Sequence, residues 1–242
     1  MHTLRIAAWS GPRNISTAMM RSWENRPDTK VCDEPLYAHY LKTTGANHPG
    51  REEVLEHHES NWEKVVQELT GPCDQRVYYQ KHMTHHLLPN ISRDWLSQVT
   101  SIFLIRNPRE MMTSLMKTIP NPCIEETGLP QQLELFTTFC SDSETPIVLD
   151  SKDVLQDPRG MLSELCEQLC IPFYEQMLAW PTGKRSTDGV WAPHWYSSVE
   201  ASSGFGDWEP KEDEIPAELE SLCLECEDIY EQLASYKMTQ KE

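Results

Sequence analysis

The stretch LRIAAWSGPRNISTAMMRSW, residues 4–23, decides the fold class. Its first part, Leu4–Trp9, is short, largely apolar and followed by a turn, which predicts a strand. The Gly- and Pro-bearing turn at residues 11–15 then leads into a helical pattern over Thr17–Glu24. A strand, such a turn and a helix N-terminus form a ready anion site, because backbone N–H groups and the helix dipole both favour a negative ligand there.

The rest of the chain alternates between strands and helices. Strands are predicted at Lys30–Cys32, Arg76–Gln80, Ser101–Ile105 and Pro146–Leu149. Helices are predicted at Glu52–Leu69, Pro108–Lys117, Pro130–Phe139, Pro158–Leu169 and, as a long last helix, Pro216–Tyr236. This alternation favours an α/β fold with a parallel sheet covered on both faces. The stretch Trp180–Pro210 shows little periodicity and is predicted as a long functional loop.

The composition favours a soluble, cytoplasmic protein. The chain has 242 residues, 38% of them hydrophobic. It shows no signal-peptide pattern and no apolar run near the ~20 residues that span a bilayer. The formal net charge of -17 opposes contact with nucleic acid and anionic membranes. An anionic ligand would therefore depend on a local cluster of cations.

The eight cysteines do not indicate a disulfide scaffold, because the chain is long and no secretion signal is seen. Cys223 and Cys226 form a C-x-x-C, but they share one helical face with neighbouring leucines. Free cysteine packs as a small hydrophobe, so a buried core is favoured over a metal or redox site. Cys166 fits the same interpretation.

Side chains of the first turn add to its anion-binding character. Arg13 supplies a fixed charge, and the hydroxyls of Ser16 and Thr17 can donate hydrogen bonds. The Walker pattern G-x-x-x-x-G-K-[ST] is not met, which disfavours a nucleoside triphosphate kinase or ATPase. Taken alone, this loop could equally be an ordinary turn between strand and helix, capped by Ser16.

A second stretch, TSIFLIRNPREMMTSLMK at residues 100–117, ends a strand at Arg106 and begins a helix that carries Ser114. Together the two stretches resemble the sulfotransferase family. In that family a P-[KR]-x-x-[ST]-[ST] loop holds the 5′-phosphosulfate of 3′-phosphoadenosine 5′-phosphosulfate (PAPS). An Arg-[DN]-Pro motif, with a Ser eight residues after its Arg, holds the 3′-phosphate.

The resemblance extends over most of the chain. VLDSKDVLQDPRGMLSELCEQLCIPF (148–173) looks like a family strand, acidic turn and helix, and SGFGDW (203–208) looks like the late loop that closes over the nucleotide. WSGPRNIST, DEPLYAHYL, LIRNP and DGVWAPHWY look like the sulfotransferase-like domain attached to some branched-chain aminotransferase-like proteins, here in a stand-alone version. The resemblance implies a P-loop-type three-layer αβα fold with a central, mainly parallel five-stranded sheet, as one domain over residues 1–242.

The resemblance also implies which residues bind the nucleotide. They are Gly11, Pro12, Arg13, Asn14, Ile15, Ser16, Thr17, Arg106, Ser114, Gly204, Phe205, Gly206 and Trp208. Some positions depart from the family pattern: Arg13 replaces the usual loop lysine, Ser202-Ser203 stand where Arg-Lys is normal, and Glu209 stands where a Lys is common. Either another cation such as Lys184 or Arg185 compensates, or the donor differs.

Sulfuryl transfer needs stabilised charge and a base that takes a proton from the acceptor. Lys81 and His82, expected at the end of a strand, resemble the family's K-[TH]-H-L-P region. Lys81 would stabilise the bridging oxygen, and His82 has the intrinsic pKa of a general base. Glu34, before a Pro at the end of the second strand, is the alternative base, as in some sulfotransferase branches. Arg13 completes the predicted catalytic set.

The predicted acceptor site draws on two segments rich in aromatic residues and histidine. Its residues are Glu34, Tyr37, His85, Trp191, His194, Trp195 and Tyr196. Tryptophan and tyrosine offer stiff contact area with a polar handle, which favours an acceptor pocket or lid over a packed loop. For a cationic acceptor, Trp191, Trp195 and Tyr196 could form part of an aromatic cage.

Plainer alternatives stay open for the same residues. Glu34 could pair with Arg13 and orient it, and Lys81 could be a solvated charge. His82, His85 and His86 could be a polar cluster at a strand end. A metal site there is disfavoured, because no cysteine or carboxylate lies at ligand spacing nearby.

The sequence thus predicts a sulfotransferase that moves a sulfuryl group from PAPS to a hydroxyl or amine of a small-molecule acceptor. Transfer would be in line, base-assisted and independent of metal, and would release adenosine 3′,5′-bisphosphate. The alternatives are a non-catalytic nucleotide-phosphate binding module and a P-loop kinase or phosphotransferase with Asp150 as its Mg²⁺ ligand. No nucleic acid or membrane partner is expected. The acceptor's identity and the oligomeric state stay open.

Overall fold

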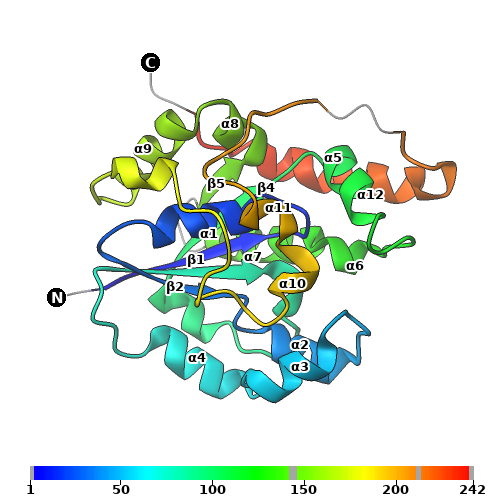
Figure 1. Cartoon of the computed structure of the whole chain (residues 1–242). Helices are drawn as coiled ribbons and strands as arrows, with labels where there is room; N and C mark the ends of the chain where they lie inside the picture. Colours follow the sequence, from blue (N-terminus) through cyan, green and yellow to red (C-terminus); the bar gives the residue numbers. More distant parts are fainter. Residues whose placement is uncertain (1–2, 142–145, 211–213, 240–242) are drawn as a thin grey trace. The chain divides into compact units, whose positions relative to one another are not determined.

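The computed structural model describes residues 3–141, 146–210 and 214–239. Its centre is a five-stranded parallel sheet in the order β2-β3-β1-β4-β5, flanked by helices (Figure 1). The strands are β1 (Leu4–Ser10), β2 (Thr29–Asp33), β3 (Val77–Met83), β4 (Thr100–Ile105) and β5 (Ile147–Asp150). The predicted α/β class, with its parallel five-stranded sheet and helical layers, is confirmed.

The chain divides into two compact units. The first unit comprises Met1–Ala8, Ser16–Ser101 and Tyr174–Phe205, and the second comprises Trp9–Ile15, Ile102–Phe173 and Gly206–Glu242. The chain passes from one unit to the other within β1 and again between Ile15 and Ser16. One domain over 1–242 stays a prediction.

In the first unit, β2 and β3 pair in parallel with Cys32 opposite Gln80 and Asp33 opposite Lys81. Helix α1 (Ser16–Glu24) packs on both strands and buries Trp23, which stacks on Tyr79 with ring centroids 5.1 Å apart. The other helices of this unit are α2 (Tyr37–Thr44), α3 (Arg51–His57), α4 (Trp62–Thr70), α10 (Ala192–Trp195) and α11 (Ser197–Glu200), with 3-10 turns at Thr84–His86, Asp94–Gln98 and Glu175–Leu178.

Two sequence predictions in this unit are wrong in detail. The helix predicted over Glu52–Leu69 is two helices, because His58 is extended and the Asn61 side chain caps α4 by accepting a hydrogen bond from the Lys64 N–H (3.0 Å). The strand predicted to end at Gln80 continues to Met83, so Lys81 lies inside β3 rather than beyond it.

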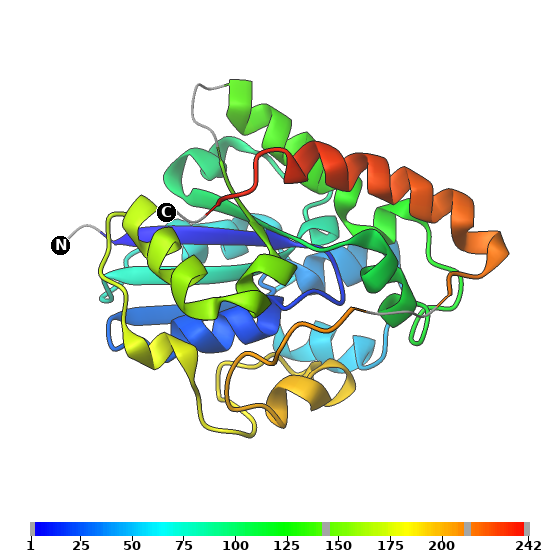
Figure 2. The same ribbon diagram turned by 90° about the horizontal axis from the view of Figure 1, so that it is seen from above.

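In the second unit, β4 and β5 pair with Ile105 opposite Asp150. The long helix α12 (Glu220–Ala234) packs on α5 (Pro108–Leu115) and α7 (Leu129–Ser141) (Figure 2). Cys223 and Cys226 on α12 are free and fully buried, which confirms their core role. The remaining elements are α6 (Ile124–Thr127), α8 (Ser151–Gln156), α9 (Pro158–Gln168) and a 3-10 turn at Ala217–Leu219.

Within the described ranges, no helix combines the length and the apolarity needed to cross a bilayer.

Candidate active site

The loop after β1 belongs to the second unit and is shaped by two residues. A Cβ on Gly11 would lie 2.4 Å from the backbone oxygen of Thr127, so only glycine fits there. The Asn14 amide donates to the carbonyl of Leu104 (2.9 Å), and its side-chain oxygen accepts from the Ile15 N–H (2.8 Å). These bonds hold the loop against the carboxyl end of β4, directly before the second predicted motif.

Arg13, Arg106 and Ser114, which come from the two predicted nucleotide motifs, meet in this unit. The Arg13 Nε donates to the Ser114 hydroxyl (2.9 Å), and Arg106 Nη1 donates to the Arg13 carbonyl (2.8 Å). Arg13 adopts a left-handed backbone with φ 55°, a strained conformation for a residue with a side chain. Burial and the nearby Arg106 charge lower the pKa of Arg13. The two cations repel each other, which makes the site receptive to an anion.

Two further side chains extend this group. Arg106 pairs with Glu110 at 3.2 Å, and the Trp208 indole N–H donates to the other oxygen of Glu110 (3.1 Å). The Lys152 ammonium lies 4.4 Å from the centre of a Trp208 ring, a cation–π contact. The sequence reasoning missed Glu110 and Lys152, although Glu110 lies in the first turn of α5, only four residues after Arg106.

The remaining residues of the predicted nucleotide set lie in the first unit, apart from Pro12 and Gly206. Ser16 and Thr17 begin α1, directly after the loop in the chain. Gly204 forms a bridge with Ala179, and Phe205 meets the edge of Trp180.

The serines at 202 and 203 are structural contacts of Trp180. The Ser202 hydroxyl accepts the Trp180 indole N–H (3.1 Å), and the Ser203 carbonyl accepts the Trp180 backbone N–H (3.0 Å). Of the suggested substitute cations, Lys184 is exposed, and Arg185 donates to the Pro181 carbonyl and lies 3.9 Å from Glu24.

Lys81 stands at the centre of a buried polar group in the first unit. Its ammonium donates to Asp33 Oδ1 (2.9 Å), Glu34 Oε1 (2.5 Å) and the Tyr196 hydroxyl (2.9 Å). The pairing of β2 with β3 places Asp33 opposite Lys81 and so brings these groups together. The Tyr196 hydroxyl also contacts both oxygens of Asp33 and accepts the Trp191 indole N–H (3.1 Å).

Burial and charge act in opposite directions on this group. Burial raises the pKa of Glu34, although Lys81 opposes that rise. Burial alone would lower the pKa of Lys81, but the carboxylates of Asp33 and Glu34 outweigh it and hold that pKa well above its ordinary value. Glu34 also has a left-handed backbone, with φ 42°. Its side chain keeps 11% exposure, against 1% for Lys81.

His82 is placed differently from its neighbour Lys81. Successive side chains of a strand point to opposite faces, so these two residues cannot serve the same side of β3. The His82 ring is buried, lies near Gln80 Oε1 (3.4 Å) and tilts against Trp95. Burial, with a contribution from Lys81, lowers the pKa of His82 to about 3, which makes it a weak base.

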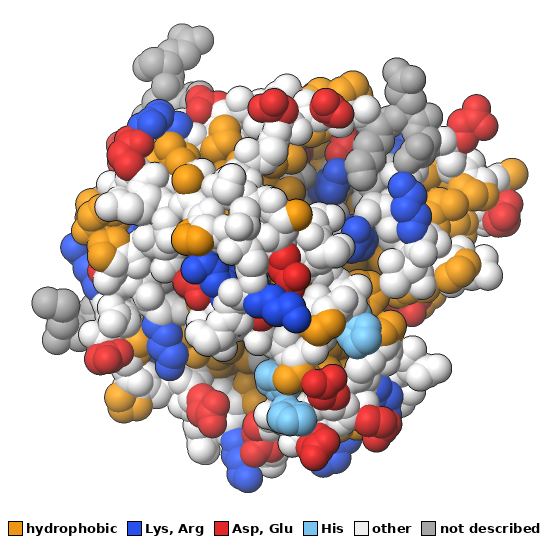
Figure 3. Space-filling model, viewed as in Figure 1, with side chains coloured by type: hydrophobic (Ala, Val, Ile, Leu, Met, Phe, Trp, Pro, Cys, Tyr) orange, Lys and Arg blue, Asp and Glu red, His pale blue; other side chains and the backbone are white. Residues whose placement is uncertain are grey.

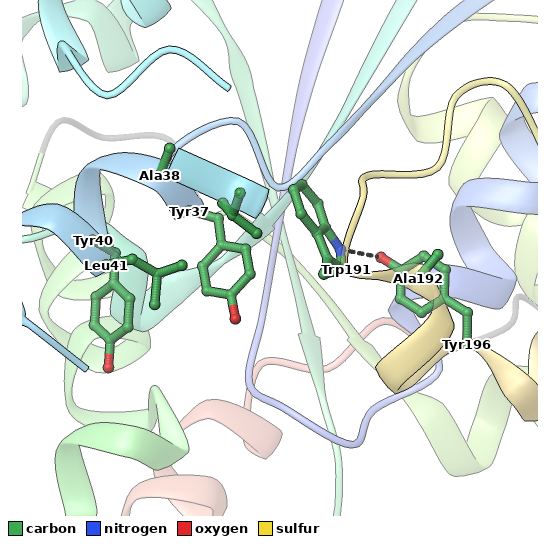
Figure 4. Packing of buried hydrophobic residues seen from close by; sticks show 8 residues of the cluster. Tyr37, Ala38, Tyr40, Leu41, Trp191, Ala192 and Tyr196 are labelled. Carbon is green, nitrogen blue, oxygen red and sulfur yellow. Dashed lines mark hydrogen bonds between the residues drawn. The ribbon is translucent and has the colours of Figure 1, made fainter. Parts of the chain in front are cut away.

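Aromatic and imidazole rings pack beside Glu34 and form what we call the ring cluster. Tyr37 stacks on His86 (4.6 Å, 6° between planes) and meets Trp191 edge-on at 5.1 Å. Its hydroxyl bonds His48 Nδ1 at 2.9 Å. Tyr37 lies between Tyr40 and Trp191, and the two tyrosine hydroxyls point the same way (Figure 4). The ring cluster consists of Tyr37, Tyr40, His48, His85, His86, Trp191 and Trp195.

The predicted acceptor residues are therefore spread over different depths. Trp191 and Tyr196 are buried, Trp195 is half-buried and His194 is exposed. The sequence reasoning missed Asp33 and His48. Asp33 carried a usable signal, because a carboxylate at the carboxyl end of a parallel strand lies at the edge where such sheets bind ligands.

The described residues contain no group of three or more His, Cys, Asp or Glu side chains arranged to hold a metal ion. Asp150, the suggested Mg²⁺ ligand, uses both carboxylate oxygens in local bonds. One accepts the Lys152 N–H (2.9 Å) as the cap of α8, and the other accepts the Tyr230 hydroxyl (2.5 Å).

A strand-ending loop with paired arginines, on a parallel five-stranded sheet, defines a nucleotide-phosphate-binding class of α/β protein. The sequence profile described as "Sulfotransferase domain" matches residues 4–222. The chain belongs to the sulfotransferase-domain family, which confirms the resemblance seen in its motifs.

Two curated proteins resemble the chain in sequence. The chain is 41% identical over 201 residues to "Branched-chain-amino-acid aminotransferase-like protein 1" of Arabidopsis thaliana, covering 83% of this chain and 36% of that protein. It is 34% identical over 226 residues to the corresponding protein 2, covering 93% and 40%. The chain thus spans well under half the length of either relative.

Two solved structures share its fold over nearly their full length. The sulfotransferase domain of the Synechococcus PCC 7002 olefin synthase superposes with a TM-score of 0.59 at 15% identity, covering 98% of both chains. A sulfotransferase from Alicyclobacillus acidocaldarius gives 0.58 at 11% identity, again over 98% of both. At such identities the likeness establishes the fold alone.

Proposed function

We propose that the chain is a PAPS-dependent sulfotransferase that modifies a hydroxyl or amine of a small molecule, working as a single domain over 1–242. The observation that carries this proposal is the conformation of Arg13 and the positive charge of Arg106 beside it. Its guanidinium is held by a strained backbone, bonded to the neutral Ser114 hydroxyl and repelled by Arg106. In a chain of net charge -17, Arg106 pairs with Glu110 while Arg13 donates to a neutral hydroxyl, and such a pair of neighbouring arginines favours a phosphate ligand.

The proposed nucleotide contacts follow from the two motifs. Ser16, Thr17 and the loop amides would hold the 5′-phosphosulfate, and Arg106 with Ser114 would hold the 3′-phosphate. Lys152, seated on Trp208, is a candidate for the cation that the family supplies before Gly204. We assign it in preference to Arg185, which is already engaged with Pro181 and Glu24.

The proposed base is Glu34 rather than His82. A carboxylate whose pKa is raised by burial accepts a proton more readily than an ordinary one, whereas the pKa of His82 is lowered to about 3. In the transfer step, the acceptor's O–H or N–H proton passes to Glu34 as its oxygen or nitrogen bonds to sulfur. Adenosine 3′,5′-bisphosphate leaves with the electron pair of the broken S–O bond. Arg13, Arg106 and Lys81 would supply the positive charge that the step requires, without a metal.

The second candidate is a nucleotide-phosphate binding module that does not transfer sulfate. The observation that favours it is the pair Ser202 and Ser203, which stand in place of two cations and bond Trp180 instead. Such a module would not distinguish a nucleotide with a 3′-phosphate from one without it.

Isothermal titration with adenosine 3′,5′-bisphosphate and with adenosine 5′-monophosphate tests nucleotide binding. We expect the bisphosphate to bind more tightly, and Arg13→Ala and Arg106→Ala each to weaken binding by at least about tenfold, because charged hydrogen bonds are lost. Arg109→Ala is the matched control. This arginine lies on α5, three residues after Arg106, but pairs with Glu220 and Glu227 at the surface, so its removal should leave the affinity unchanged. Equal affinities of the wild type and both test variants would reject the assignment.

Transfer itself is tested with labelled PAPS and a panel of small alcohols and amines. Glu34→Gln should retain bisphosphate binding and lose transfer, since the amide cannot take the proton. If the two nucleotides bind without 3′ selectivity and no acceptor in the panel is modified, the binding-module alternative replaces the enzyme.

A further inference from the structure

The ring cluster forms a graded series from Glu34 towards the surface of the first unit. His86 and Tyr37 are 2% and 3% exposed, whereas His48 and Trp195 are half-buried. Ring centroids along the series are 4.6 Å apart from His86 to Tyr37, 5.8 Å from Tyr37 to His48 and 6.4 Å from His48 to Trp195. A molecule that reached Glu34 along this series would meet aromatic and imidazole rings.

The charge beside these rings is not balanced. Asp33 and Glu34 share the single ammonium of Lys81, which leaves one excess negative charge when both carboxylates are ionised. Histidines do not supply the missing charge, because burial lowers the pKa of His85 to about 3 and that of His86 well below its ordinary value. Near neutral pH His85 and His86 are therefore uncharged, and the carboxylates beside them leave their surroundings negative.

Two polar atoms in the ring cluster lack a partner. The Nδ1 atoms of His85 and His86 are buried and make no hydrogen bond within the described part of the chain. The Nδ1 of His86 lies 3.9 Å from Glu34 Oε2, beyond hydrogen-bond distance. An unsatisfied buried polar atom is unfavourable, so this pair points to a ligand with hydrogen-bonding groups next to Glu34.

The outer surface has the same sign of charge. Residues 37–64, which run through α2 and α3 into α4, contain three Lys or Arg and five Glu residues. His side chains are bordered by Asp and Glu side chains over α2 and α3 (Figure 3). This field would attract a cation and repel an anion.

We propose that the acceptor is an organic cation, an ammonium compound whose hydroxyl or amine reaches Glu34 while its charge rests against the ring cluster. This inference rests on the proposed sulfotransferase function and names its acceptor class. Aromatic faces attract cations, and the excess carboxylate charge adds to that attraction. The cage expected from the sequence is thus relocated. Trp191 donates to the Tyr196 hydroxyl, which itself bonds Lys81 and Asp33. Tyr37, His48 and Trp195 lead outward instead.

A bound cation would also assist the chemistry. Positive charge near Glu34 favours its ionised form, which is the form that can take a proton from the acceptor. The acceptor's hydroxyl or amine proton passes to Glu34 as the new bond forms to sulfur, and adenosine 3′,5′-bisphosphate leaves with the electron pair of the broken S–O bond. The ammonium charge is unchanged by the step.

The test uses matched probes on the full chain saturated with adenosine 3′,5′-bisphosphate. Choline and 3,3-dimethylbutan-1-ol have nearly the same shape and differ by the charge on one atom, and tyramine and 4-propylphenol form a second pair of this kind. Titration calorimetry should give each cation at least about fivefold higher affinity than its neutral partner, the range of cation–π contacts. Trp195→Leu and Glu34→Gln should each reduce that preference without changing bisphosphate affinity. Tyr236→Leu, which removes a half-exposed ring of the second unit, is the control and should leave the preference intact.

Bisphosphate affinity separates the two proposals. If bisphosphate does not bind, the proposed function fails, whatever the probes do. If it binds and the cations show no advantage in either pair, or no probe binds at all, the cationic acceptor is refuted while the nucleotide assignment stands.

Discussion

Replacement of Lys81 by methionine gives the sharpest test of the buried polar group. Methionine keeps much of the length of the lysine stem but removes the ammonium that donates to Asp33, Glu34 and Tyr196. The carboxylate of Asp33 is only 1% exposed, so water cannot replace the lost donor. Two carboxylates would then face each other without a counter-charge.

Breaking a buried ion pair from one side typically destabilises a protein by about 3–5 kcal/mol. We expect about 4 kcal/mol here, at the middle of that range, because two carboxylates lose one shared partner. With a urea m-value of about 3 kcal/mol per M, the unfolding midpoint falls by roughly 1.3 M. The deficit should depend on pH. Burial already raises the pKa of Glu34, and without Lys81 that pKa rises further above its unfolded value. The variant's stability therefore falls as pH rises, and its deficit is smaller at pH 5 than at pH 8.

Urea unfolding followed by tryptophan fluorescence measures both effects. Lys64→Met is the matched control, because its ammonium is 66% exposed and its pair with Glu59 spans 3.3 Å at the surface. Asp33→Asn added to Lys81→Met should recover part of the loss by removing one buried charge. The reasoning is refuted if Lys81→Met moves the midpoint no further than Lys64→Met, or if the deficit grows as the pH is lowered.

Three further predictions concern the loop, the proposed metal ligand and acid stability. Gly11→Ala should lower the melting temperature and weaken bisphosphate binding, because the new Cβ meets a backbone oxygen at 2.4 Å, whereas Gly206→Ala meets nothing within 4 Å and should be tolerated in melting experiments. Asp150→Ala should lower stability by about 1 kcal/mol through the lost helix cap and leave bisphosphate affinity unchanged with or without Mg²⁺; a Mg²⁺-dependent loss of affinity would contradict this. His82 and His85 have folded pKa values of about 3, below the ordinary 6.5. The unfolded chain therefore binds a proton at each of these histidines at a higher pH than the folded chain does. Each histidine should reduce the free energy of unfolding by up to about 1.4 kcal/mol per pH unit as the pH falls from 6.5 towards 3. Urea midpoints that fall as steeply with pH in His85→Gln as in the wild type would contradict this prediction.

The parts of the fold that the sequence predicted well depend on local patterns. The strand, turn and helix of residues 4–24 were readable because Gly11, Pro12 and two hydroxyls mark the turn between an apolar run and a helical one. The meeting of Arg13 with Arg106 was predictable as well, since the carboxyl ends of parallel strands share one edge of a sheet. The break at residues 58–61 left a signal that was not used, because Asn61 followed by an apolar helical pattern is a common helix start.

Features that depend on strand pairing and burial left weaker signals. Tyr37 and His48 lie 11 residues apart, His86 is much further along the chain, and no periodicity connects the three. Ser202 and Ser203 were noticed for the cations they replace, but their bonds to Trp180 depend on two distant segments coming together. Lys152 was missed because its importance rests on Trp208, which lies 56 residues further along.

The choice between Glu34 and His82 as the proposed base depends on where β3 ends. With the strand predicted to end at Gln80, Lys81 and His82 lie just at its end, where both side chains could face one ligand. Once the strand continues to Met83, the alternation of side chains allows only one of them on the side of Glu34, and pairing with Asp33 selects Lys81. His82 is then committed to the opposite face, where burial holds its pKa at about 3. The three additional strand residues thereby favour Glu34 as the base, because the alternation of side chains along β3 places His82 on the face opposite Lys81 and Glu34.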